Sequence, residues 1–102
     1  MVIVRRSTIH GMGVFATKDI PSKFLIECDV LEIQSSQLTK DYEFPFIGNR
    51  VCLHIGFGSF LNSSKKPNVK HMAIDTQEKV SYFEALVDIK KGDELFLCYY
   101  DE

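Results

Sequence analysis

Residues 60–68 of this chain read Phe-Leu-Asn-Ser-Ser-Lys-Lys-Pro-Asn, and residues 93–99 read Asp-Glu-Leu-Phe-Leu-Cys-Tyr. The first stretch is a polar loop that follows a glycine-rich apolar run, so Asn62 is expected to begin it in a buried place. A buried asparagine needs hydrogen-bond partners, and a polar cofactor can supply them. The second stretch alternates as a strand does, which puts Tyr99 on the face of its leucines. A solvated turn and a core tyrosine explain each stretch equally well when it is taken alone.

A third stretch, residues 11–16, reads Gly-Met-Gly-Val-Phe-Ala. Gly11 and Gly13 around Met12 let a backbone approach a ligand closely and offer it N–H and C=O groups. A plain turn fits the same pattern. The third glycine and the following helix of a dinucleotide site are missing.

Composition narrows the classes of protein. A chain of 102 residues, 45% of them hydrophobic, is predicted to form one domain over residues 1–102. A net charge of −2 argues against direct binding of nucleic acid, which needs a basic face, and is compatible with a basic peptide as partner. Its small size favours a homodimer, because small domains bury a modest share of their surface.

Membrane, disulfide and metal sites have little support. Apolar runs stay shorter than the roughly 18 residues that a membrane span needs, and residues 2–6 lack the order of a signal peptide. Three cysteines without a CxxC pair indicate buried thiols in a reducing, intracellular compartment, cytoplasmic or nuclear. His10, His54 and His71 show no ligand spacing, so no metal site is expected, and His54 is expected inside.

Short strands dominate the predicted structure, which is therefore mostly β. They are expected over residues 2–4, 13–16, 24–33, 51–55, 69–74, 80–87 and 95–99. One short helix of about two turns is expected over residues 35–42, with Ser35 or Ser36 as its N-cap. Residues 19–23 and 88–92 are similar in sequence and predict two similar hairpins. Gly92 suits a positive φ there, and Lys23 in the matching place would carry a strain of about 1 kcal/mol.

The three stretches, in this order, resemble the SET domain of protein-lysine methyltransferases. Residues 11–16 are similar to the family's first cofactor motif, residues 62–68 to its Asn-His-Ser-x-x-Pro-Asn motif, and residues 92–99 to its Gly-Glu-Glu-Leu...Tyr strand. The short length looks closest to the minimal SET proteins of large DNA viruses and bacteria. The resemblance implies a fold of several short sheets with a threaded, pseudoknot-like loop near the C-terminus.

The resemblance also implies an activity. It is methyl transfer from S-adenosylmethionine, leaving S-adenosylhomocysteine, to a lysine of a basic protein tail such as a histone. Tyr99 would orient methyl and amine, and Tyr42 would line the lysine channel. The cofactor would be held by Gly11, Met12, Gly13, Asn62, Ser63 and Tyr99. His71 is either a channel residue or a structural one.

Two departures from the family pattern leave alternatives open. Ser63 stands where the family usually has histidine. The chain ends at Glu102, where relatives usually continue with a tail over the adenine, which implies an open pocket or one covered by a second subunit. A catalytically inactive SET-like interaction module is the alternative function, and a small β-barrel with look-alike loops is a third.

Overall fold

The computed structural model describes residues 1–98. Its elements are β1 (Val2–Arg6), β2 (Met12–Ala16), β3 (Leu25–Ile33), η1 (Lys40–Tyr42), β4 (Phe44–Pro45), β5 (Val51–His54), η2 (Phe57–Phe60), β6 (Asn62–Ser63), β7 (Val69–Asp75), β8 (Val80–Ala85) and β9 (Glu94–Leu97). Both η elements are short 3-10 helices. The predicted mostly β fold is therefore confirmed, and each expected strand is present with ends shifted by one or two residues.

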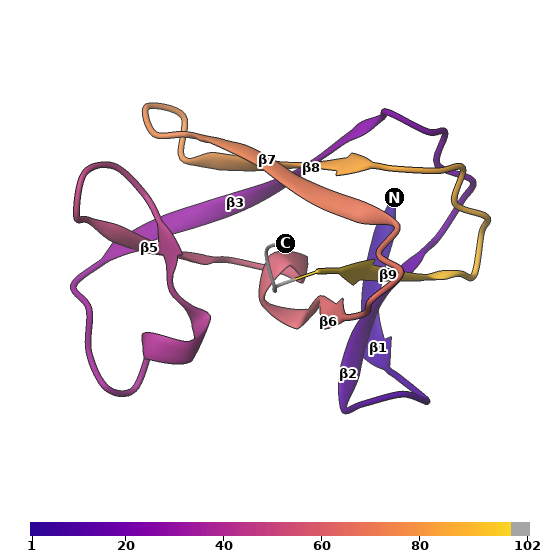
Figure 1. Ribbon diagram of the computed structural model, residues 1–102, viewed down its shortest axis with the longest axis horizontal. Helices are drawn as coiled ribbons and strands as arrows, with labels where there is room; N and C mark the ends of the chain where they lie inside the picture. The colour runs from indigo at the N-terminus through magenta and orange to yellow at the C-terminus, as the bar shows by residue number, and fades with distance from the viewer. Residues whose placement is uncertain (99–102) are drawn as a thin grey trace.

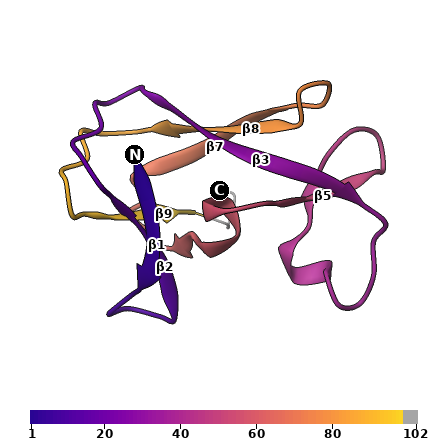
Figure 2. The same ribbon diagram turned by 180° about the vertical axis from the view of Figure 1, so that it is seen from behind.

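Two small sheets form the molecule. One has the order β1-β2-β9-β6, and the other has the order β4-β5-β3-β8-β7. Figure 1 shows β3, β7 and β8 running together, with the β1–β2 hairpin crossing their direction, and Figure 2 shows the same arrangement from behind. The core between the sheets includes the fully buried residues Val14, Phe83 and Leu95. Alternation along β9 buries Leu95 and Leu97 and leaves Phe96 half-buried, as the sequence predicts for these three residues.

The expected two-turn helix over residues 35–42 is wrong, because only Lys40–Tyr42 forms a single 3-10 turn. Side chains of the segment bind to one another instead: the hydroxyls of Ser35 and Thr39 both donate to the Glu43 carboxylate. Neither Ser35 nor Ser36 caps a helix. Leu38 is 91% exposed, so the segment lacks the apolar packing that a helix this short needs.

Residues 19–23 and 88–92 form two similar turns, as their sequences indicate, but the prediction that they belong to hairpins is wrong, because β2 and β3 lie in different sheets and so do β8 and β9. The two turns bind each other. Ile20 and Ile89 exchange both main-chain hydrogen bonds. The Asp88 carboxylate accepts from the main-chain N–H of Ser22, and the Asp19 carboxylate accepts from that of Lys91. Lys23 and Gly92, at matching positions, have φ of 73° and 94°. This approximate two-fold arrangement joins the chain before β3 to the chain before β9.

Candidate functional site

Strand β9 brings distant segments together. It pairs antiparallel with β2, through Val14 and Leu95, and parallel with β6, through Asn62 and Phe96. A parallel pair cannot be joined by a tight turn, so the chain must travel through β7 and β8 before it returns. The glycine-bearing turn before β2 and the Asn62 segment thus lie on the two sides of β9 (Figure 1).

Asn62 is at the centre of this arrangement. Its side-chain nitrogen Nδ2 donates to the main-chain oxygens of His10 and Met12, both at 3.1 Å, and to Oε2 of Glu94 at 2.8 Å. Three acceptors on one side fix the orientation of the amide, because only its NH₂ group can face them. The amide oxygen Oδ1 must then point the other way, and within residues 1–98 it accepts no hydrogen bond. Asn62 therefore presents an acceptor, which is the group that an ammonium needs.

Glu94 connects the three segments. One carboxylate oxygen accepts from Ser7 Oγ at 2.9 Å and the other from Asn62, while its main-chain oxygen accepts from Asn68 Nδ2 at 2.9 Å. A Cβ on Gly13 would lie 2.3 Å from Oε2 of Glu94, so Gly13 makes room for this carboxylate. We call Ser7, Asn62, Asn68 and Glu94 the Asn62 cluster.

The loop before β2 is shaped by its own hydrogen bonds. Gly11 has φ of 47°, which favours glycine, and its carbonyl accepts from the main-chain N–H of Ser7 at 2.7 Å. Ser7 Oγ accepts in turn from the N–H of Ile9 at 3.0 Å. The turn explains Gly11 without a ligand, while it leaves Met12 41% exposed beside Asn62.

Asn68 closes the other end of the polar loop against β9. Its side-chain oxygen accepts from the N–H of Phe96 at 2.7 Å, and its own N–H donates to the Phe96 carbonyl at 3.1 Å. The N–H of Ser64 donates to the Leu97 carbonyl at 3.1 Å. The loop thus holds β9 at both of its ends, which is the threaded arrangement that the sequence predicts. Ser63, between them, is exposed.

The structure brings together some of the predicted residues. Met12, Gly13 and Asn62 meet at Glu94, and Ser63 follows directly on β6. Tyr42 lies in η1 and is 59% exposed, outside the hydrogen bonds of the Asn62 cluster. Tyr99, the predicted catalytic residue, lies outside the described residues.

A second polar cluster is buried in the other sheet. Ser81 Oγ lies 2.9 Å from Nε2 of His54 and 2.8 Å from Nε2 of His71, and Phe44 packs edge-on against both rings. Ser81 has one hydroxyl hydrogen and can donate it to only one ring, so the other ring must donate to the Ser81 oxygen. Both histidines can then be neutral, with opposite tautomers. We call His54, His71 and Ser81 the histidine cluster.

Burial controls the charge of this cluster. His54 is 4% exposed, and its Nδ1 is buried with no hydrogen-bond partner. Burial lowers the pKa of His54 to about 4, and the neighbouring His71 adds to the effect. Burial also lowers the pKa of His71. The expectation that His54 packs inside is confirmed.

Burial likewise governs the thiols. The pKa of Cys28 and that of Cys52 are both raised, mainly by burial, which makes these thiols unreactive. Cys98 is half-buried. Within residues 1–98 no disulfide joins the cysteines, and no group of three His, Cys, Asp or Glu side chains is arranged to hold a metal ion. Over the same residues, no helix is long and apolar enough to cross a membrane.

Sequence reasoning missed the central role of Glu94 and the part of Ser7. A signal for Glu94 exists, because it is an acid at the start of an otherwise apolar strand, facing a glycine on the paired strand. The histidine cluster had no such signal, since its members lie 10 and 17 residues apart along the chain and meet only through sheet register.

Comparisons with known proteins agree with this geometry. The SET domain family model matches residues 11–100. A histone-lysine N-methyltransferase of Schizosaccharomyces pombe, specific for H3 lysine-37, is 27% identical over 96% of this chain and 72% of its own length. The histone-lysine N-methyltransferase set-2 of Caenorhabditis elegans is 28% identical over 97% of this chain, which spans 8% of that longer protein.

A solved structure shows the same fold. The crystal structure of a candidate histone methyltransferase of Plasmodium falciparum superimposes with a TM-score of 0.85, at 24% identity, over 99% of this chain and 94% of that one. The family model covers nearly the whole chain, and the motifs that it matches are the ones that meet at β9. The chain therefore belongs to the SET-domain family of protein-lysine methyltransferases.

Proposed function

We propose that this chain transfers a methyl group from S-adenosylmethionine to a lysine ε-amine of a histone or a similar basic protein tail. The observation that carries the proposal is the fixed orientation of the Asn62 amide, which leaves Oδ1 as an unused acceptor. A methionyl ammonium is a donor that this oxygen fits. The histone substrates of the yeast and worm relatives support the choice of protein.

The residues proposed to hold the cofactor are Gly11, Met12, Gly13, Asn62, Ser63 and Tyr99. S-adenosylmethionine supplies, when bound, an electrophilic methyl group on a sulfonium. Asn62 would accept from the methionyl ammonium, and the exposed residues Met12 and Ser63 would face the rest of the amino-acid end. Without the family's usual histidine, Ser63 would contribute through its backbone.

The residues proposed to act on the lysine are Tyr99 and Tyr42. Only a neutral amine attacks, and holding lysine neutral near pH 7.4 costs about 4 kcal/mol in water. An aromatic channel that excludes water reduces that cost, because burial disfavours the ammonium. Tyr99 would align the amine with the methyl group, and alignment contributes up to about 7–11 kcal/mol to such reactions.

The test is transfer of label from S-adenosylmethionine to histones and basic peptides. Tyr99→Phe should lower turnover far more than cofactor affinity. Asn62→Asp should weaken cofactor binding at least ten-fold in calorimetry, because a carboxylate would face three acceptors. Asn49→Ala, an exposed asparagine in another loop, is the matched control and should leave affinity unchanged. Cofactor binding without transfer to any histone would contradict the proposal.

We also infer that residues 1–102 act as a single domain and that two copies associate. Exposed apolar side chains such as Ile9 (68%), Leu38 (91%) and Val87 (53%) support association. Activity on histones would place the protein inside cells, in the nucleus or in the cytoplasm before histone import. Light scattering that gives a monomer at high concentration would contradict the dimer.

A further inference from the structure

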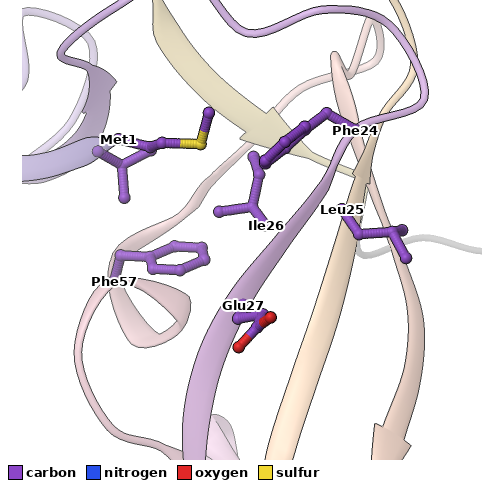
Figure 3. A pocket seen from close by; sticks show the side chains of 7 residues that line it. Met1, Phe24, Leu25, Ile26, Glu27 and Phe57 are labelled. Atoms are coloured by element: carbon purple, nitrogen blue, oxygen red, sulfur yellow. The ribbon is translucent and has the colours of Figure 1, made fainter.

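An open hollow of about 300 Å³ lies between the start of β1, η2 and β3, away from the Asn62 cluster. Its lining residues are Met1, Val2, Phe24, Leu25, Ile26, Glu27 and Phe57. Figure 3 shows Met1, Ile26 and Phe57 on one side of the β3 ribbon and Leu25 on the other. Met1 is 37% exposed and Phe24 is 41% exposed, so the hollow presents apolar surface to solvent.

One wall of the hollow is a strand edge that no other strand pairs with among residues 1–98. Along β3 the residues that bond to β8 alternate: Phe24 O accepts from Ala85 N, and Val30 N donates to Lys79 O. By this alternation the main-chain groups of Leu25 and Glu27 point away from β8. Strand β5 covers the opposite edge only from residue 29 onward, where Asp29 O accepts from Ile55 N. The edge at Leu25 and Glu27 is therefore open toward the hollow.

The side chains along the β3 edge are acidic. Glu27 is the one ionisable side chain in the lining, and it is exposed. Asp29 follows on the same face of β3, whereas Glu84, opposite Leu25 on β8, already has Lys70 opposite it on β7. Glu27 forms no ion pair with any of the described residues, among which the ion pair present joins Arg50 to Glu32. A cationic side chain laid along the edge would meet Glu27 first.

We propose that this edge binds a short extended segment of a partner protein in which apolar and basic residues alternate. A segment that pairs with Leu25 and Glu27 gains main-chain hydrogen bonds, as in other cases of strand addition. Its side chains must then alternate between the two faces of β3. Apolar side chains would enter the hollow beside Phe24, Ile26 and Phe57. Basic side chains would lie on the outer face beside Glu27.

A hollow of about 300 Å³ is at the lower end of the range for ligand pockets, so it accommodates a few residues and not a long strand. The site would anchor a partner away from the Asn62 cluster. Its occupation does not depend on methyl transfer.

The probe is a fluorescein-labelled peptide, Gly-Ser-Leu-Arg-Leu-Arg-Leu-Ser-Gly, followed by anisotropy without cofactor. Arginine replaces lysine so that the probe is no substrate for lysine methylation. Wild-type protein should bind it, and Glu27→Lys should weaken binding at least ten-fold. A twin peptide with glutamate in place of arginine should bind to the Glu27→Lys variant better than to wild type. Glu78→Lys, the same charge change at an exposed turn, should have no effect.

Amide shifts in NMR spectra of the wild-type protein locate the binding without any substitution. The largest shifts should be those of Leu25 and Glu27, and N-methylation of alternate peptide amides should abolish them. Absence of binding, an equal loss with Glu78→Lys, or shifts centred on the Asn62 cluster would overturn the proposal. Dissociation of a dimer by Glu27→Lys would overturn it too, since a second copy would then occupy the edge.

Discussion

The Asn62 cluster and the histidine cluster both consist of polar side chains from strands and loops, but they differ in where their unused hydrogen-bonding atom lies. In the Asn62 cluster every acceptor of Glu94 is used inward, and the amide oxygen of Asn62 is left over at a half-exposed position. In the histidine cluster the unused atom, His54 Nδ1, is buried beyond the reach of solvent. An unused acceptor at the surface is available to a ligand, whereas an unused nitrogen in the core is a constraint on charge.

The comparison teaches where binding is to be expected. Hydrogen bonds to a carboxylate are stronger than neutral ones, so Glu94 can hold three chain segments in place and leave Asn62 oriented for a ligand. The histidine cluster must stay neutral to remain buried. It supports the sheet and offers nothing to a ligand.

The largest effect is expected from Glu94→Leu. The substitution removes the carboxylate that accepts hydrogen bonds from Ser7 and from Asn62. Hydrogen bonds to charged groups contribute about 1.5–3 kcal/mol each to stability. The free energy of unfolding should fall by about 3 kcal/mol or more in urea titrations, and cofactor affinity should fall at least ten-fold in calorimetry.

Glu78→Leu, at an exposed turn residue, is the control for Glu94→Leu and should change neither quantity. An affinity for cofactor that survives Glu94→Leu would show that the Asn62 cluster is structural only. The contrast with the histidine cluster would then disappear.

The histidine cluster should make the free energy of unfolding depend on pH. The folded-state pKa of His54 is lowered from its ordinary value of 6.5 to about 4, so the unfolded chain binds a proton more readily than the folded one. Stability is therefore complete above pH 6.5 and is lost as pH falls toward 4, by about 3 kcal/mol for a shift of this size. The lowered pKa of His71 acts in the same direction.

Urea titrations at pH 7.5 and pH 5 measure this loss. His54→Leu should reduce the loss between the two pH values, and at pH 7.5 it should cost about 0.5–1.5 kcal/mol, because it removes the hydrogen bond between Nε2 of His54 and Ser81 while Nδ1 has no partner to lose. His10→Leu, at an exposed histidine, should keep the wild-type pH dependence. An unchanged pH dependence in His54→Leu would refute the assignment.

The fold was largely predictable because its strands carry local signals. β-branched and aromatic runs between turn residues mark β3, β7 and β8 within two residues of their ends. The helix prediction failed because the serine and threonine side chains near residue 36 bind Glu43 instead of capping a helix. That choice depends on a residue beyond the predicted helix.

The site was predictable only in part. The order of the motifs along the chain predicted that Met12, Gly13 and Asn62 belong to one site, and these residues do lie together around Glu94. The sequence did not reveal that the Glu94 side chain fills the space that a Cβ on Gly13 would need. This contact arises from the pairing of β2 with β9, and pairing partners cannot be predicted from periodicity alone.

Alanine substitutions at two glycines, one beside each cluster, test the packing of both clusters. A Cβ on Gly58 would lie 2.6 Å from Cγ of His54, and a Cβ on Gly13 would lie 2.3 Å from Oε2 of Glu94. Each alanine substitution should cost about 1–3 kcal/mol of unfolding free energy, as overpacking does. Adding His54→Ala should relieve Gly58→Ala, and adding Glu94→Asp should relieve Gly13→Ala.

The two double-mutant cycles distinguish the clusters by ligand binding. Gly13→Ala should weaken cofactor binding, because it displaces the carboxylate that orients Asn62. Gly58→Ala should lower stability with a smaller change in affinity, since it meets a ring of the histidine cluster. Equal losses of affinity in both variants would mean that the two clusters act as one unit.

The smallest effect is expected outside both clusters, at the two similar turns of residues 19–23 and 88–92. Lys23 has φ of 73° where Gly92 has 94°, and a left-handed conformation costs a non-glycine residue about 1–2 kcal/mol. Glycine loses about 0.5–1 kcal/mol through its greater freedom in the unfolded chain. Lys23→Gly should therefore stabilise the protein by about 0.5 kcal/mol and raise Tm by about 2–4 °C.

The reverse substitution, Gly92→Lys, should destabilise by a similar amount, because the two turns make matching hydrogen bonds. Neither change should affect cofactor affinity or the pH dependence of stability, since neither residue contacts the Asn62 cluster or the histidine cluster. Thermal and urea unfolding at pH 7.5 measure the first effect, and calorimetry measures the second. If Lys23→Gly lowers Tm, the strain at Lys23 is absent and the two turns differ more than their hydrogen bonds indicate.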